Sequence, residues 1–184
     1  MPYSDKPTSS SGSISPRTML VIALLVALEL AMSALESLIP PFLPLPGIKL
    51  GLANIITLIS FSLLSKRQVF IVVAMRLALA GFVLATFLTP SFLISVGGGL
   101  LSFLIMSLLW GRKPFSVVGV SLAGAASHNL GQLAAVYLLM SNSAILFYLP
   151  LLLTMSVPMG FFTGYAAKAA LAALKATGVV HRLT

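Results

Sequence analysis

Long apolar segments alternate with short polar or proline-containing segments along most of the 184-residue chain. Each apolar segment approaches the roughly 20 residues that an α-helix needs to cross a bilayer. Continuous runs of Leu, Ile, Val and Ala favour helices over the alternating strands of a membrane β-barrel. The pattern therefore predicts an all-α integral membrane protein, a six-transmembrane-helix bundle with spans at residues 18–38, 49–65, 68–89, 92–110, 116–140 and 144–173.

The two ends of the chain are predicted to lie outside this membrane domain of residues 18–173. Residues 1–17 are rich in Ser, Pro and Gly, which predicts a disordered tail, and residues 174–184 form a second tail. A signal peptide is the alternative for the first segment, because residues 31–33 resemble a cleavage site. Glu29 would interrupt the apolar stretch of such a signal peptide, and cleavage would leave only five spans. A disordered tail is therefore the favoured interpretation of residues 1–17.

Basic residues mark every second connection between the predicted spans. The chain is 59% hydrophobic and 8% charged, whereas about a quarter of a soluble domain is charged, and its net charge is +8. Cytoplasmic loops accumulate Lys and Arg, which places both termini in the cytoplasm and explains the positive charge without a nucleic-acid partner. The nine orienting residues are Lys6, Arg17, Lys66, Arg67, Arg112, Lys113, Lys168, Lys175 and Arg182.

The first predicted helix has two distinct faces. Its small face consists of Ala23, Ala27 and Ala31, which are four residues apart, and its acidic face consists of Glu29 and Glu36. At about 100° per residue the two faces point in nearly opposite directions. Small residues allow close helix packing in lipid, whereas carboxylates need a polar or protein interior. The simplest arrangement directs the acids inward and the alanines toward another protein, although alanine is also common in membrane helices.

Three ionisable side chains are predicted at similar depths within the membrane. Glu29, Arg76 and His128 all fall near the middle of their spans. An unpaired charge at this depth is costly, so Glu29 and Arg76 are predicted to form a buried ion pair. The pair has either a structural role alone or a role in a binding site as well.

A polar group in the fifth span is the most concentrated candidate site. His128 and Gln132 share a helix face, Asn129 is adjacent, and Gly131 lies between them. Such side chains either join neighbouring helices or line a binding site, and their clustering favours the site. Gly97 to Gly99 at the start of the fourth span permit a close helix contact or a kink.

Glu36, Lys49 and Asn54 extend this polar set toward the outer surface. They flank a segment with four prolines, Pro40 to Gly47, which cannot be helical. The segment is either a rigid connector or a cover for a site that opens to the outside. The full set of predicted substrate-binding residues is Glu36, Lys49, Asn54, Arg76, His128, Asn129 and Gln132.

The sequence gives little support for catalysis. It has no cysteine, no His-x-x-x-His pair, no Gly-x-Ser-x-Gly and no phosphate-binding Gly-x-x-x-x-Gly-Lys motif. We therefore expect no enzymatic activity, no metal site and no cofactor.

Two segments of the chain are distinctive, Glu36 to Pro40 with Pro46 to Asn54, and Ala125 to Gln132. Together with Arg76 and the region after the triple glycine, they resemble the Gx transporter family, whose members are often labelled heptaprenyl diphosphate synthase component I. The resemblance covers residues 18 to 173. Prenyl diphosphate synthases bind magnesium diphosphate through aspartate-rich motifs, whereas this chain has a single aspartate, Asp5. The synthase label therefore fits the residues poorly.

The family resembles the S components of energy-coupling factor (ECF) transporters, six-helix proteins that capture vitamins or related micronutrients outside the cell. The resemblance implies that Ala23, Ala27 and Ala31 contact a transmembrane T component joined to two cytoplasmic ATPases. It implies uptake of a small organic solute, with vitamin-like, isoprenoid or quinone-related cargo possible, across the bacterial cytoplasmic membrane. The alternative is a non-transporting scaffold or accessory subunit of a quinone, prenyl or extracellular redox system.

Overall fold

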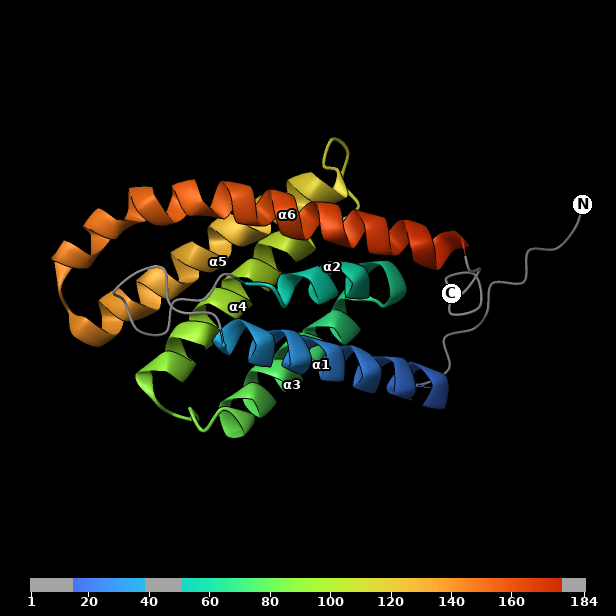
Figure 1. The fold of residues 1–184 in the computed structure, drawn as a ribbon, viewed down its shortest axis with the longest axis horizontal. Coiled ribbons are helices and arrows are strands. Elements are labelled where there is room, and N and C mark those ends of the chain that lie inside the picture. The colour runs from blue at the N-terminus through green and yellow to red at the C-terminus, as the bar shows by residue number, and fades with distance from the viewer. Residues whose placement is uncertain (1–14, 39–50, 177–184) are drawn as a thin grey trace, which may run out of the picture.

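The computed structural model describes residues 15–38 and 51–176, and in these two ranges the regular secondary structure is entirely helical (Figure 1). Lys49 and the proline-rich segment lie outside the described residues, as do both tails. The helices are α1 (Pro16–Ser37), α2 (Asn54–Leu63), α3 (Lys66–Val83), α4 (Pro90–Leu109), α5 (Val117–Met140), the short 3₁₀ helix η1 (Ser143–Tyr148) and α6 (Leu149–Ala176).

Local sequence signals explain where several helices begin. Ser15, Thr89 and Ser116 each accept a hydrogen bond from a backbone N–H of the first turn, which satisfies a group that the helix leaves unpaired. Pro16 and Pro90 follow two of these caps, at a position where the missing N–H costs nothing.

The second and third helices differ most from the predicted spans. Helix α2 has 10 residues and begins at Asn54 instead of residue 49, and α3 ends at Val83 instead of residue 89. After α3, Ala85 and Leu88 adopt left-handed φ values of 51° and 60°, which are incompatible with a continuing helix. The sequence remains apolar before the start of α2 and after the end of α3, so the apolar pattern alone overestimated the lengths of these two helices.

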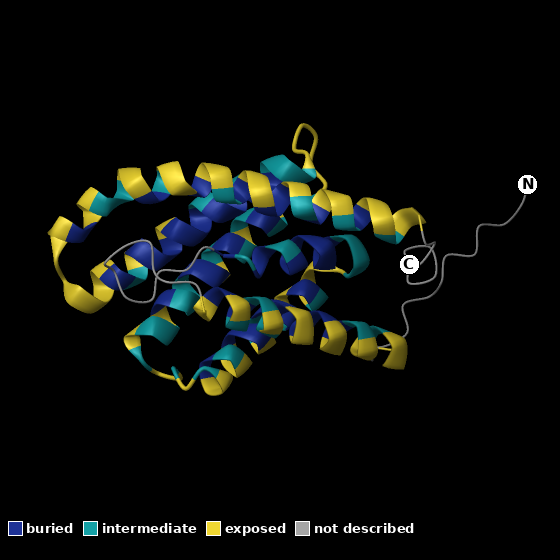
Figure 2. Ribbon diagram, viewed as in Figure 1, coloured by how far each residue is buried: buried dark blue, intermediate teal, exposed yellow. Residues whose placement is uncertain are grey.

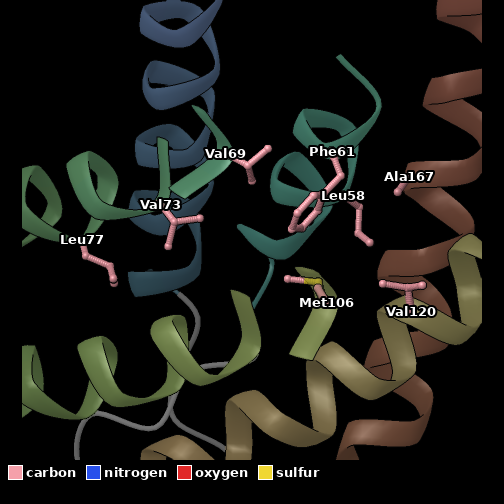
Figure 3. Packing of buried hydrophobic residues seen from close by; sticks show 8 residues of the cluster. All are labelled: Leu58, Phe61, Val69, Val73, Leu77, Met106, Val120 and Ala167. Atoms are coloured by element: carbon pink, nitrogen blue, oxygen red, sulfur yellow. The ribbon is translucent and has the colours of Figure 1, made fainter. Parts of the chain in front are cut away.

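The short α2 lies at the centre of the bundle. It contacts each of the other five α-helices, and its buried residues Leu58 and Phe61 belong to the core shown in Figure 3. Phe61 also stacks on Trp110, with ring centroids 5.5 Å apart. The core joins five helices through Leu58, Phe61, Val69, Val73, Leu77, Met106, Val120 and Ala167.

Side-chain hydrogen bonds add polar contacts between α4, α5 and α6. Ser102 donates to the Gly124 carbonyl oxygen over 3.0 Å, and the hydroxyls of Ser121 and Thr163 are 2.8 Å apart. Hydrogen bonds of this kind help to join helices in lipid, where hydrophobicity gives no net drive for association.

The outer surface is strongly apolar, as expected for contact with lipid. Figure 2 shows exposed residues along the outward faces of α1 and α6, where large side chains such as Leu24 and Phe161 are more than half exposed. Within the described residues, three segments are both long and apolar enough to cross a membrane: α1, α4 and the continuous segment Ser143–Ala176. The chain is therefore a multi-pass membrane protein, and the count of six spans stays a prediction.

Successive α-helices run in opposite directions (Figure 1). The start of α1, the α2–α3 turn, the α4–α5 connection and the end of α6 consequently lie toward one end of the bundle. We call this the basic end, because it carries a group of exposed basic residues. They are Arg17, Lys66, Arg67, Arg112, Lys113, Lys168 and Lys175.

Candidate ligand-binding site

A small cavity lined by polar and apolar side chains lies in the half of the bundle away from the basic end. Four of the predicted site residues line it: Glu36 from α1, Arg76 from α3, and His128 and Gln132 from α5. Its volume is about 20 Å³, enough for about one water molecule. The remaining lining residues are Ser33, Gly51, Leu77, Ala80, Gly81, Thr86, Phe92 and Ser95. Segments far apart in sequence thus meet at one polar site.

An ion pair fixes Arg76 beside this cavity. Arg76 Nε lies 3.2 Å from Glu29 Oε2, and the exposed fractions of the two side chains are 9% and 0%. The hydroxyl of Thr57 donates to Glu29 Oε1 over 2.6 Å. Helices α1, α2 and α3 are therefore joined at one carboxylate. The pair uses Nε, which leaves the terminal guanidinium nitrogens of Arg76 for other acceptors.

Glu36 connects the end of α1 to the approach to α2. Its side chain is buried, and its Oε1 accepts a hydrogen bond from the backbone N–H of Gly51. Gly51 has a φ of +84°, a left-handed conformation that suits glycine. A Cβ at this position would also lie 3.2 Å from Asn54 Nδ2. Glu36 therefore holds a backbone turn as well as lining the cavity.

The triple glycine of α4 packs directly on the polar face of α5. A Cβ at Gly98 would lie 2.6 Å from Gln132 Cγ and 3.1 Å from His128 Cε1. A Cβ at Gly99 would lie 3.1 Å from a terminal nitrogen of Arg76. The glycines permit the close approach without breaking α4, and they give three polar side chains room at the cavity.

Gln132 is the most unusual of these polar groups. Its side chain is 0% exposed, and among the described residues neither its Oε1 nor its Nε2 has a hydrogen-bond partner. An unsatisfied buried amide typically costs about 1–3 kcal/mol. Gln132 therefore presents a buried donor and a buried acceptor that no described protein group satisfies.

Two predicted site residues lie elsewhere. Asn129 donates from Nδ2 to the Leu152 carbonyl oxygen over 2.8 Å, so it joins α5 to α6 and does not line the cavity. Asn54 is buried beside Gly51 but does not line the cavity either. Asn129 follows His128 in the sequence, but the rotation of about 100° per residue turns it toward α6.

Sequence reasoning missed several hydroxyl groups near the site. Ser33 lies one turn after Glu29 on the buried face of α1, and Thr57 contacts Glu29 from α2. The spacing of Ser33 between the two acids was a usable signal. Thr57 gave none, because its role depends on how α2 packs against α1.

The two faces of α1 have opposite environments. Glu29 and Glu36 are buried, whereas Ala23, Ala27 and Ala31 are all exposed. The alanines share this outer surface with the exposed residues Leu20, Leu24 and Leu28. Together these six residues form what we call the α1 outer face. It is the reverse side of the helix that carries the acidic residues to the site.

Comparison with known proteins identifies one family. The model of the family described as heptaprenyl diphosphate synthase component I matches residues 25–170, which include the cavity and most of the bundle. No curated protein and no solved structure matches the chain. In the described part of the chain, no group of three His, Cys, Asp or Glu side chains is arranged to hold a metal ion.

Proposed function

The chain belongs to the heptaprenyl diphosphate synthase component I family, the Gx transporter family, and on this basis we propose that it is the substrate-binding subunit of an uptake system. In this proposal it resembles an ECF S component. It binds a small organic solute outside the bacterial cytoplasmic membrane and docks on a transmembrane T component with two ATPases. It carries out no reaction itself.

The observation that carries the proposal is the division of α1 into a buried acidic face and an exposed face with alanines. Its inner face brings Glu29 to Arg76 and Glu36 to the cavity, while its outer face presents exposed alanines. A binding subunit that must also dock needs both features, since one surface recognises the solute and the other recognises the transporter. Close packing of helices in lipid is favoured by small side chains.

The position of the cavity supports uptake from outside. Positive residues accumulate on the cytoplasmic side of membrane proteins, so the basic end is assigned to the cytoplasm. The cavity lies in the opposite half, because its lining comes from the end of α1, the later parts of α3 and α5 and the start of α4. In this orientation a solute enters from the external side.

The small volume of the cavity has a consequence for binding. About 20 Å³ does not hold an organic solute, so the cavity walls must separate when a solute binds.

The docking role is tested by enlarging one alanine on the α1 outer face. Ala27→Leu is expected to abolish co-purification of the T component and ATPases, because the added side chain separates the two helix backbones. The readout is quantitative mass spectrometry after mild detergent extraction from the native host.

A matched control is Ala169→Leu, which makes the same change at an exposed position of α6. It is expected to leave the complex intact. Full recovery of the transporter subunits with Ala27→Leu would contradict the assigned docking face. Recovery of only prenyl or redox enzymes with the wild-type protein would instead identify a scaffold.

A further inference from the structure

The buried amide of Gln132 restricts the chemistry of the bound solute, if the cavity is the solute site as proposed above. A carboxamide offers one acceptor, Oε1, and two donor hydrogens on Nε2. Both atoms are buried without a hydrogen-bond partner among the described residues, and the side chain lines the cavity. A ligand that satisfies Gln132 must therefore supply a donor and an acceptor together.

The packing around Gln132 confines the stem of its side chain. Gly98 lies directly against its Cγ, and the adjacent backbone atoms of Gly97 and Gly131 leave no room for a side chain between α4 and α5. Since the stem of the side chain is confined, its amide stays beside the cavity. A confined side chain loses less conformational entropy on binding than a mobile one.

Arg76 adds a second requirement at the same cavity. Its Nε forms an ion pair with Glu29, so its terminal nitrogens supply planar donors for an oxygen atom of the ligand. Arg76 contributes donors only, whereas Gln132 requires a donor from the ligand as well as an acceptor.

We infer that the site recognises a solute with an amide-type edge, such as that of a lactam or an imide, in which an N–H lies next to a carbonyl oxygen. The N–H donates to Gln132 Oε1, one carbonyl accepts from Gln132 Nε2, and a further oxygen accepts from Arg76. A quinone has carbonyl acceptors but no N–H, and would leave Gln132 Oε1 without a donor. A polyprenyl chain supplies neither group.

Lumazine and menadione provide a matched pair of probes. Both have two fused six-membered rings and two ring carbonyls, but lumazine has an imide N–H between its carbonyls and menadione has no N–H. We expect wild-type protein in lipid nanodiscs to bind lumazine at least about tenfold more tightly than menadione, because a buried polar site rejects analogues that leave its groups unpaired. Equilibrium dialysis measures both affinities, with empty nanodiscs as the blank.

The variant Gln132→Leu separates recognition from stability. It removes the amide at similar volume, so lumazine affinity is expected to fall at least about tenfold and the preference over menadione to disappear. Its thermal unfolding temperature without ligand is expected to be equal or higher, since an unsatisfied amide has been removed from the interior. The control Gln68→Leu changes an amide in the first turn of α3 and should preserve the preference.

Three results would overturn the inferred edge: no lumazine binding by the wild-type protein, equal affinity for the two probes, or unchanged lumazine binding by Gln132→Leu. Native mass spectrometry of gently extracted protein distinguishes this failure from failure of the proposed function. A retained quinone or prenyl compound would refute the solute class and preserve the binding role. A wild-type protein that retains no small molecule, binds neither probe and recovers no transporter subunits would refute the function itself.

Discussion

At the scale of single residues, the carboxylate of Glu29 is the central polar contact. It pairs with Arg76 and accepts from Thr57 in a region that is almost entirely buried. Burying two charges is costly, but removing one partner is worse, because the other charge then stays buried without compensation.

Arg76→Leu is accordingly expected to lower the free energy of unfolding by about 3 kcal/mol or more. The double variant Glu29→Leu/Arg76→Leu should lose much less than the sum of its two single changes, since it removes both charges. Thr57→Val, which deletes only a hydroxyl, should cost about 1–3 kcal/mol. Unfolding of all variants in one detergent measures the coupling free energy between Glu29 and Arg76. If the losses in the free energy of unfolding are additive, the two charges do not act as a pair.

At the scale of elements, the contact between α4 and α5 depends on glycine. A Cβ at Gly131 would lie 2.3 Å from the Gly97 carbonyl oxygen, which is far inside van der Waals contact. A Cβ at Gly119, near the start of the same helix, would find its nearest neighbour at 3.6 Å. There is therefore no room for a side chain at Gly131, whereas a methyl group fits at Gly119.

Gly131→Ala is expected to destabilise the protein by about 1–3 kcal/mol, because α4 and α5 must separate to accommodate the methyl group. Gly119→Ala should be neutral or stabilise it by up to about 1 kcal/mol, since alanine favours helix. Thermal unfolding of the two variants side by side measures the difference. Equal effects would mean that the close contact does not limit the packing of these helices.

At the scale of the whole molecule, the proposed orientation gives a labelling test. The natural chain has no cysteine, so single cysteines can be introduced without background reactivity. Ser143→Cys, at the end opposite the basic end, should react with a membrane-impermeant maleimide in intact cells. Lys113→Cys should react only after the membrane is permeabilised, because positive connections face the cytoplasm. The reverse pattern would invert the topology and move the cavity to the inner half.

The sequence by itself determined the membrane class, the approximate positions of the helices, the predicted contact between Glu29 and Arg76 and the two faces of α1. These depend on local hydrophobicity, on helical periodicity and on the high cost of an unpaired charge in lipid. The same local information grouped Asn129 with His128 and Gln132, although Asn129 instead joins α5 to α6.

Only the tertiary structure decided why α2 is short and which polar groups share the cavity. The ten residues of α2 rise about 15 Å, too little to cross a bilayer alone, but α2 is surrounded by the other helices. The non-helical backbone at Gly51, just before α2, is buried by protein. Non-helical backbone at membrane depth is tolerated where protein surrounds it. Likewise, Gln132 meets Arg76 at one cavity because the glycines of α4 allow a close approach. The residues that line this cavity are distant in sequence, so no local pattern specifies that they meet.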